Sequence, residues 1–170
     1  GSILHGISTT RKGGHTFFAN MYETYNDLSD NIKERINDLW VIHDHDYIIN
    51  LSSELKSKKN KGSYEQLPSV KHPLVQIHPV TRKKSLFLSP HTMENIDNFD
   101  KKEGRKLLDE LIEHSIQTKY VYKHLWNDDD IIMWDNRCTM HSVEPFDNSS
   151  IKRIMHRVTL VGENKPIPAL

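Results

Sequence analysis

The sequence is poor in cysteine and in long apolar segments. Its single cysteine, Cys138, cannot form a disulfide framework within the chain and suits a reducing compartment, so we expect a cytoplasmic protein. No segment approaches the roughly 18 apolar residues that a membrane-spanning helix requires, so we expect no membrane partner. Neither sign of charge dominates, because 23 Lys and Arg residues balance 23 Asp and Glu residues. This balance argues against a nucleic-acid partner, favours a small molecule, and is compatible with a homo-oligomer.

The sequence is also low in hydrophobic residues. They make up 36% of the 170 residues, and the mean hydropathy is −0.66, which indicates polar loops around a modest core. A chain of this length is expected to form a single domain, residues 1–170. Residues 51–70, with KSKKNKGS at their centre, contain too little apolar surface to offset the entropy of ordering them. We therefore expect a mobile loop or lid there.

The apolar patterns predict a mixture of strands and helices. Strands are expected where β-branched and aromatic residues are bounded by turn sequences, at residues 3–9, 72–79, 85–89, 119–126, 131–134 and 153–161. Helices are expected at residues 19–28, 30–40 and 101–117. The last of these has an apolar face that contains Leu107, Leu108, Leu111 and Ile112. The order of these elements predicts an α+β domain, mainly β, built on an antiparallel sandwich or barrel.

The C-terminal third contains a histidine followed by two arginines. His141 follows a predicted strand and turn, and Arg153 and Arg157 come twelve and sixteen residues later on the next predicted strand. Side chains four residues apart on a strand point to the same face, so both guanidinium groups can address one pocket. Guanidinium binds carboxylate or sulfonate through two parallel hydrogen bonds, which indicates a site for one or two small organic acids. The alternative, favoured by spacing alone, is a basic surface strand with solvated arginines.

Several segments resemble one enzyme family. They are GGHTFFANMYETYNDLSD, HPLVQIHPVTRKKSLFLSPHTMENI, and IIMWDNRCTMHSVEPFD followed by KRIMHRVTLVGENKPI. In this order they are similar to the Fe(II)/2-oxoglutarate-dependent taurine and 2,4-dichlorophenoxyacetate dioxygenases. The glycine pair with threonine is weak evidence alone, whereas WDNR-x3-H joined to RIMHR-x-T is specific.

The resemblance implies a fold and a set of residue roles. The fold is a double-stranded β-helix, a jelly-roll whose mouth holds Fe(II) between two histidines and a carboxylate, with positions left for 2-oxoglutarate and O2. His141 matches the second histidine of this triad. Arg153 would bind the far carboxylate of 2-oxoglutarate with help from the Thr16 hydroxyl, and Arg157 would face the acidic group of the primary substrate.

The first histidine and the carboxylate of the triad are missing from the sequence. In the family they form a His-x-Asp motif upstream of the Gly-Gly-x-Thr segment, whereas here twelve residues precede Gly13 and no His-x-Asp occurs. Residues 2–9 resemble the strand that follows this motif. We therefore expect the chain to be N-terminally incomplete, with the two ligands before residue 1, and the chain by itself to be inactive. The alternative is a degenerate relative that lacks these ligands.

The predicted function is a dioxygenase that hydroxylates a small acidic substrate, a taurine-like sulfonate or a carboxylate, and releases succinate and CO2. One alternative is a non-catalytic jelly-roll module that binds a small organic anion through Arg153 and Arg157. A second alternative is a zinc or other metal-binding protein organised on His43-Asp44-His45-Asp46. We expect that segment instead to end a helix and begin the loop, because neighbouring side chains on an extended chain point in opposite directions.

Four other residues have expected roles near the site or on strands. Trp134 and Asn136 are expected to support the strand and turn that carry His141. His15 stands where the family usually has Asp, and we expect it to be an exposed turn residue rather than a substrate contact. His78 is expected to be a strand-end residue with ordinary hydrogen bonds.

Overall fold

The computed structural model describes residues 1–10, 12–47, 49, 68–147, 149, 152–162 and 165–169, and every statement below concerns these residues. They form a mostly β protein with few helices, which confirms the predicted α+β class. The elements are β1 (Ser2–Ser8), β2 (Thr16–Asn20), α1 (Met21–Asn26), α2 (Asp30–Ile36), β3 (Trp40–His43), β4 (Val70–Pro73), β5 (Val75–Ile77), β6 (Lys84–Leu86), β7 (Met93–Ile96), α5 (Lys101–Ser115), a 3-10 turn (Thr118–Tyr120), β8 (Val121–His124), β9 (Ile131–Trp134), β10 (Thr139–Val143), β11 (Ile154–Thr159) and β12 (Ile167–Pro168).

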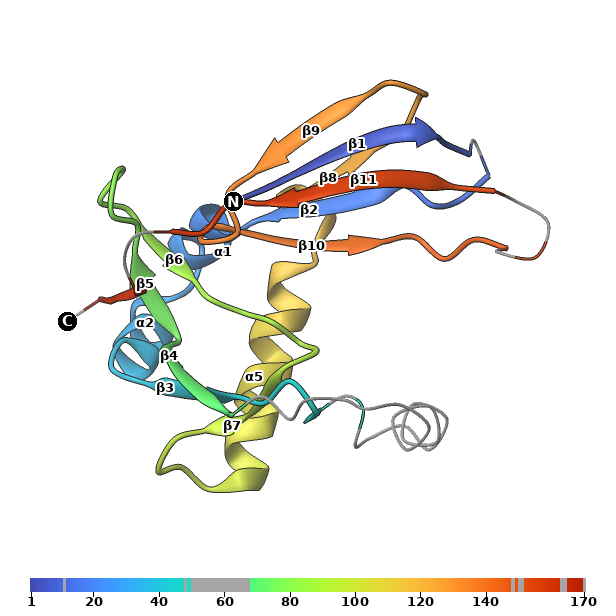
Figure 1. Cartoon of the computed structure of the whole chain (residues 1–170). Helices are drawn as coiled ribbons and strands as arrows, with labels where there is room; N and C mark the ends of the chain where they lie inside the picture. The colour runs from blue at the N-terminus through green and yellow to red at the C-terminus, as the bar shows by residue number, and fades with distance from the viewer. Residues whose placement is uncertain are drawn as a thin grey trace.

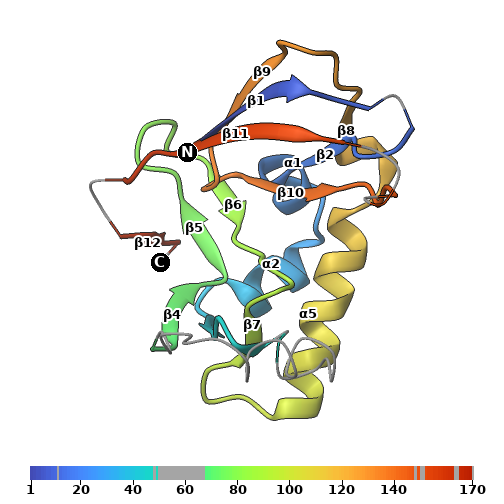
Figure 2. The same ribbon diagram turned by 45° about the vertical axis from the view of Figure 1, so that its right-hand side comes forward.

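The strands form antiparallel three-stranded sheets. Sheets β11-β1-β9 and β10-β2-β8 lie together at the top of Figure 1, and Phe18 of one contacts Trp134 of the other with ring centroids 5.2 Å apart. Sheets β12-β5-β6 and β4-β3-β7 lie below them with the helices, as Figure 2 shows from a second direction. The chain thus consists of an upper pair of sheets and a lower part where most of the apolar core is found.

Strand β1 sets the register of the upper sheet. Leu4 pairs with Arg157, and Ser2 pairs with both Trp134 and Thr159. Directly opposed side chains share a face of a sheet, and the face alternates along each strand, so Ser2, Trp134 and Arg157 lie on one face. The register shifts between Gly6 and Ser8, where an irregularity interrupts the pairing with β11.

Helix α5 confirms the predicted helix at 101–117 apart from its last two residues. Asp100 caps it by accepting hydrogen bonds from the backbone N–H groups of Lys102 and Glu103. Its apolar face is buried in the lower core, where Leu107, Leu108 and Leu111 pack with residues of α1 and of strands β3, β5, β6 and β7. No helix among the described residues is long and apolar enough to cross a membrane.

Two predicted elements were placed wrongly. The second helix ends at Ile36, and Trp40 begins strand β3, whose pairing with β4 and β7 overrides the helical spacing of its apolar residues. The predicted strand 72–79 is two strands, β4 and β5, which belong to different sheets. Most of the predicted lid lies outside the described residues, and its last residue, Val70, already belongs to β4.

Candidate active site

His141 lies on β10 between aromatic side chains and an arginine. Its ring centroid is 4.9 Å from that of Trp134 and 6.4 Å from that of Phe18, which is its pairing partner on β2. His141 is exposed, and the described residues provide no hydrogen bond to either of its ring nitrogens. Loss of solvent around the ring and, secondly, the charge of Arg157 lower the pKa of His141. A lowered pKa favours the neutral imidazole, which is the form that binds metal ions.

A chain of hydrogen bonds joins Trp134 to Arg157. Trp134 Nε1 donates to Asn136 Oδ1 at 2.7 Å, and Asn136 Nδ2 donates to Ser2 Oγ at 3.0 Å. Arg157 Nη2 reaches the same Ser2 oxygen at 3.4 Å. These contacts agree with the supporting role predicted for Trp134 and Asn136, which stays a prediction. No sequence pattern indicated a role for Ser2, because its place beside Asn136 and Arg157 follows only from the strand register.

The glycine pair makes room for Arg153. Gly13 and Gly14 have φ angles of +76° and +69°, which side chains other than glycine rarely adopt. A Cβ atom on Gly14 would lie 3.2 Å from both Cδ and Nε of Arg153. The Arg153 guanidinium lies over the Phe146 ring, 5.7 Å from its centroid, and burial lowers its pKa. Its Nε is buried without a hydrogen-bond partner among the described residues, so the solvated surface arginine of the alternative is wrong here.

Thr16 is buried at the start of β2 near this turn. Its Oγ1 accepts a hydrogen bond from Trp126 Nε1 at 2.9 Å, which leaves the hydroxyl proton available to a carboxylate. His15 is also buried, so the prediction of an exposed turn residue is wrong. The backbone explains this: Gly14 N donates to the Glu144 carbonyl, and Glu144 N donates to the His15 carbonyl. These bonds hold the turn against the segment after β10, and His15 Nε2 lies 4.0 Å from a Glu144 carboxylate oxygen.

The two arginines contact different residues. Arg153 precedes β11 and lies against Gly14 and Phe146, whereas Arg157 lies within β11 near Ser2 and His141. Four residues of extended chain span about 13 Å. This separation suits two anionic groups, one bound by each arginine, better than a single group bound by both.

Known proteins share this arrangement of sequence and fold. The family described as "Taurine catabolism dioxygenase TauD, TfdA family" matches residues 1–159. The chain belongs to this family. It is 33% identical over 165 residues to the alpha-ketoglutarate-dependent 2,4-dichlorophenoxyacetate dioxygenase of Burkholderia sp. (strain RASC), with 95% of this chain and 53% of the relative covered. It is 34% identical to the (S)-phenoxypropionate/alpha-ketoglutarate-dioxygenase of Sphingobium herbicidovorans, with 96% of this chain and 58% of the relative covered.

A solved structure agrees with these matches. The crystal structure of AAD-2 in complex with Mn(II) and N-oxalylglycine superposes with a TM-score of 0.83 at 37% identity, covering 98% of this chain and 64% of AAD-2. The chain therefore has the family fold in the part that it contains. It spans about half the length of the curated relatives that it matches.

His43-Asp44-His45-Asp46 forms no group with metal-site geometry within the described part of this member of the dioxygenase family. His43 is buried at the end of β3, and its Nδ1 lies 2.8 Å from Thr92 Oγ1. Burial and, secondly, His72 lower the pKa of His43 to about 4. Among the described residues, the only group of three or more His, Cys, Asp or Glu side chains close enough to hold a metal ion is elsewhere, at His78, Asp135 and Cys138. The zinc-protein alternative therefore loses its proposed ligands.

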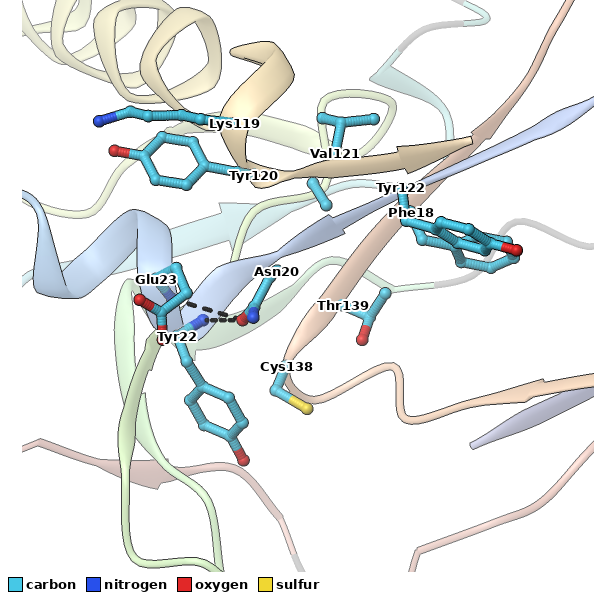
Figure 3. Close-up of a pocket in the computed structure, with 11 residues that line it drawn as sticks. Phe18, Asn20, Tyr22, Glu23, Lys119, Tyr120, Val121, Tyr122, Cys138 and Thr139 are labelled. Atoms are coloured by element: carbon cyan, nitrogen blue, oxygen red, sulfur yellow. Dashed lines mark hydrogen bonds between the residues drawn. The ribbon is translucent and has the colours of Figure 1, made fainter. Parts of the chain in front are cut away.

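A cavity of about 600 Å³ opens beside β2 and β10. Figure 3 shows its lining, in which Phe18 and Tyr122 stack and Asn20 caps α1. None of the residues with predicted iron, 2-oxoglutarate or substrate roles lines it. Trp134 and Asn136 instead line part of a second cavity, of about 490 Å³. Neither cavity coincides with the predicted site.

Proposed function

We propose that this chain contributes the second iron histidine, the 2-oxoglutarate arginine and the substrate arginine of an Fe(II)- and 2-oxoglutarate-dependent dioxygenase. The observation that carries the proposal is the position of His141 between Phe18 and Trp134, with Arg157 beside it, in a chain of this family. Sheets β11-β1-β9 and β10-β2-β8 are then parts of the jelly-roll, and the 170 residues act as one domain.

His141 fits an iron ligand in three respects. Its lowered pKa favours the neutral ring, two aromatic side chains lie against it, and no hydrogen bond from the described residues occupies either nitrogen. The described residues offer no second and third ligand beside it, so these come from outside the described part of the chain. When bound, Fe(II) and 2-oxoglutarate would activate O2, so that one oxygen atom hydroxylates the substrate, the other enters succinate, and CO2 is released.

Arg153 and Thr16 bind the far carboxylate of 2-oxoglutarate. Arg153 presents a partly desolvated guanidinium that has no carboxylate partner among the described residues, and a charge-assisted hydrogen bond is strong in such surroundings. Thr16 adds one donor, because Trp126 uses one of its oxygen lone pairs and leaves its proton free. The buried turn at Gly14 and His15 excludes water from this end of the site.

Arg157 binds the anionic group of the primary substrate. It is exposed toward solvent, and within the described part of the chain its one hydrogen bond is a long contact with Ser2, so its guanidinium is available for a second acid. A carboxylate fits the fork of a guanidinium, and relatives named for phenoxyacetate and phenoxypropionate act on carboxylates. A sulfonate has the same charge and suitable oxygens, so both classes belong in the substrate panel.

The test separates binding from turnover. Binding of 2-oxoglutarate to the 170-residue chain is measured by calorimetry at low salt, and Arg153→Leu should weaken it at least tenfold, whereas Arg35→Leu on exposed α2 should not. In the whole protein with Fe(II), succinate release should depend on an added small acid and should be lost in His141→Ala. Succinate release that survives His141→Ala would refute the proposed iron site.

A non-catalytic anion-binding module is the second candidate. The observation in its favour is that the described residues supply one iron ligand rather than three. This candidate predicts that Arg153 and Arg157 bind organic acids equally well with and without metal, and that the whole protein forms no succinate.

A further inference from the structure

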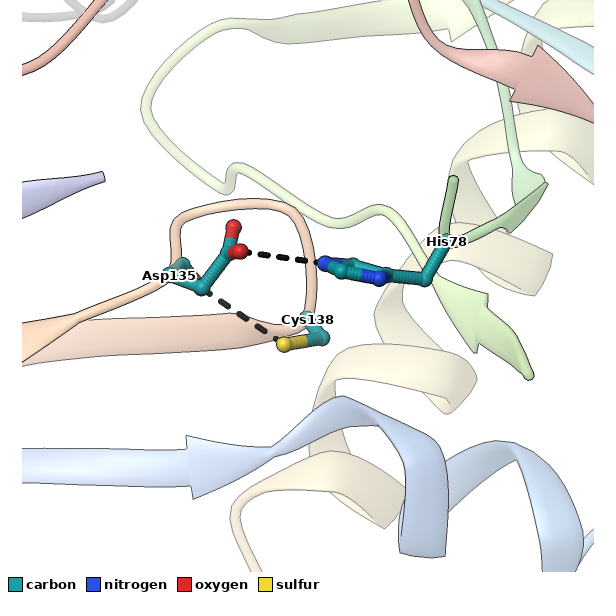
Figure 4. Close-up of side chains that lie close together, drawn as sticks. All are labelled: His78, Asp135 and Cys138. Carbon is teal, nitrogen blue, oxygen red and sulfur yellow. Dashed lines mark hydrogen bonds and ion pairs between the residues drawn. The ribbon is translucent and has the colours of Figure 1, made fainter. Parts of the chain in front are cut away.

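A cluster of metal-ligating side chains lies outside the residues with predicted roles. His78, Asp135 and Cys138 place one ligand atom each within 4.8 Å of the others. Figure 4 shows His78 reaching from the loop after β5 toward the turn that joins β9 to β10. His78 is buried, and the other two residues are half-buried.

The hydrogen bonds of His78 leave no nitrogen free for a metal. Its Nδ1 accepts from the backbone N–H groups of Val80 at 3.3 Å and Thr81 at 3.2 Å. A neutral imidazole that accepts at Nδ1 carries its proton on Nε2, and this atom lies 3.0 Å from Asp135 Oδ2. Asp135 also accepts hydrogen bonds from the guanidinium and the backbone N–H of Arg137, and these bonds strongly lower the pKa of the Asp135 carboxyl group. The donors and acceptors therefore match one another without an ion.

The same turn is anchored to the lower part of the molecule at further points. The Arg137 carbonyl accepts from the Gln76 side chain and from Ser85 Oγ, both buried on β5 and β6. The Cys138 carbonyl accepts from Met21 N at 3.0 Å at the start of α1. Residues 135–138 are thus tied to the core by side chains from distant parts of the sequence.

This turn connects Trp134 to His141, the predicted iron ligand, and the rings of these two residues are in contact. Trp134 directly precedes Asp135, and His141 lies three residues after Cys138. We propose that His78 is a positioning residue: by donating to Asp135 it fixes the β9–β10 turn and so holds the Trp134 ring against His141. The importance of this contact for catalysis rests on the proposed function, but the position of His141 is measurable without iron or 2-oxoglutarate.

Two substitutions test the roles of the two His78 ring nitrogens separately. The amide nitrogen of His78→Gln can reach Asp135 as Nε2 does, whereas the amide oxygen of His78→Asn can accept from Val80 and Thr81 as Nδ1 does but leaves Asp135 without its donor. Nuclear Overhauser contacts between the Trp134 and His141 rings should persist in His78→Gln and be lost in His78→Asn. The contact between the His114 and Tyr120 rings, with centroids 5.2 Å apart, should persist in both and reports that the fold is intact. His91→Asn, at an exposed histidine, is the matched control.

Three results would overturn the proposal. The first is a Trp134–His141 contact that persists in His78→Asn, and the second is its loss in His78→Gln with the His114–Tyr120 contact intact. The third needs no variant: nitrogen shifts of the native protein that place the His78 proton on Nδ1, or that move when Zn(II) is added, would show a free or metal-binding Nε2. If the ring contacts follow the predicted difference while the whole protein forms no succinate, His78 positions His141 as proposed and the proposed function alone has failed.

Discussion

Replacing Gly14 with alanine should test how the glycine turn shapes the site. Gly14 is buried with a φ of +69°, and an added Cβ would lie 3.0 Å from Thr10 Cγ2 and 3.2 Å from two side-chain atoms of Arg153. The left-handed conformation costs alanine about 1–2 kcal/mol relative to glycine. Crowding of a packed site typically adds about 1–3 kcal/mol. We therefore expect the free energy of unfolding to fall by about 2–5 kcal/mol, which a domain near the middle of the usual range of about 5–15 kcal/mol withstands.

The same substitution should weaken anion binding, because the Arg153 side chain must move to admit the new methyl group. One lost charge-assisted hydrogen bond costs about 1.5–3 kcal/mol, which corresponds to an affinity loss of at least about tenfold. Gly13→Ala is the matched control: its φ is +76°, but its Cβ would meet the Pro145 carbonyl oxygen at 2.6 Å rather than Arg153. It should lower stability at least as much and 2-oxoglutarate affinity much less.

Urea unfolding followed by fluorescence gives the first quantity, and calorimetric titration of 2-oxoglutarate gives the second. The reasoning is refuted if Gly14→Ala changes the free energy of unfolding by less than about 0.5 kcal/mol, the usual effect of a surface substitution. It is refuted equally if both glycine variants reduce the affinity for 2-oxoglutarate by the same factor.

Three further predictions concern stability. Trp134→Phe removes the donor to Asn136 and should cost about 1 kcal/mol in urea unfolding, and no loss would show that this hydrogen bond contributes nothing. Leu108→Ala on the buried face of α5 should cost about 2–5 kcal/mol, whereas Ile116→Ala, at an exposed position, should cost far less. Because the pKa of His43 is lowered to about 4 from 6.5, the unfolded chain takes up a proton first, so stability should fall by up to about 3 kcal/mol as pH drops from 6.5 to 4. His43→Gln should flatten that part of the pH–stability profile, and an unchanged slope would contradict the assignment.

The sequence predicts local features of the fold better than contacts between distant segments. Helix α5 could be recognised because Leu107, Leu108 and Leu111 repeat at helical spacing behind the capping residue Asp100. Trp40 could not be placed, because its apolar spacing continues that of α2 and only pairing with Pro73 on β4 makes it a strand. Helical and extended patterns are equally compatible with such a short apolar segment.

In the site, too, some residues can be identified from a local segment, whereas others depend on contacts between distant parts of the chain. The WDNR-x3-H segment, through its resemblance to the dioxygenase family, identifies His141, Trp134 and Asn136 as candidate site residues, and the fold brings Trp134 and His141 together. The partnership of His78 with Asp135 joins residues 57 positions apart, and no local pattern contains it. The burial of His15 was likewise invisible in the sequence, because it depends on backbone hydrogen bonds to Glu144.

The register of β11 against β1 has a consequence for how the chain can vary in length. Arg157 faces Ser2 and His141 only because it pairs with Leu4, and side chains alternate between the faces of a sheet. Deleting or inserting one residue between Ile154 and Arg157 would either turn Arg157 to the opposite face or displace Arg153 from its place before β11, beside Gly14 and Phe146. A change of two residues keeps the parity of Arg157 in the sheet. A library of one- and two-residue deletions across β11, scored by 2-oxoglutarate binding, would show this parity directly.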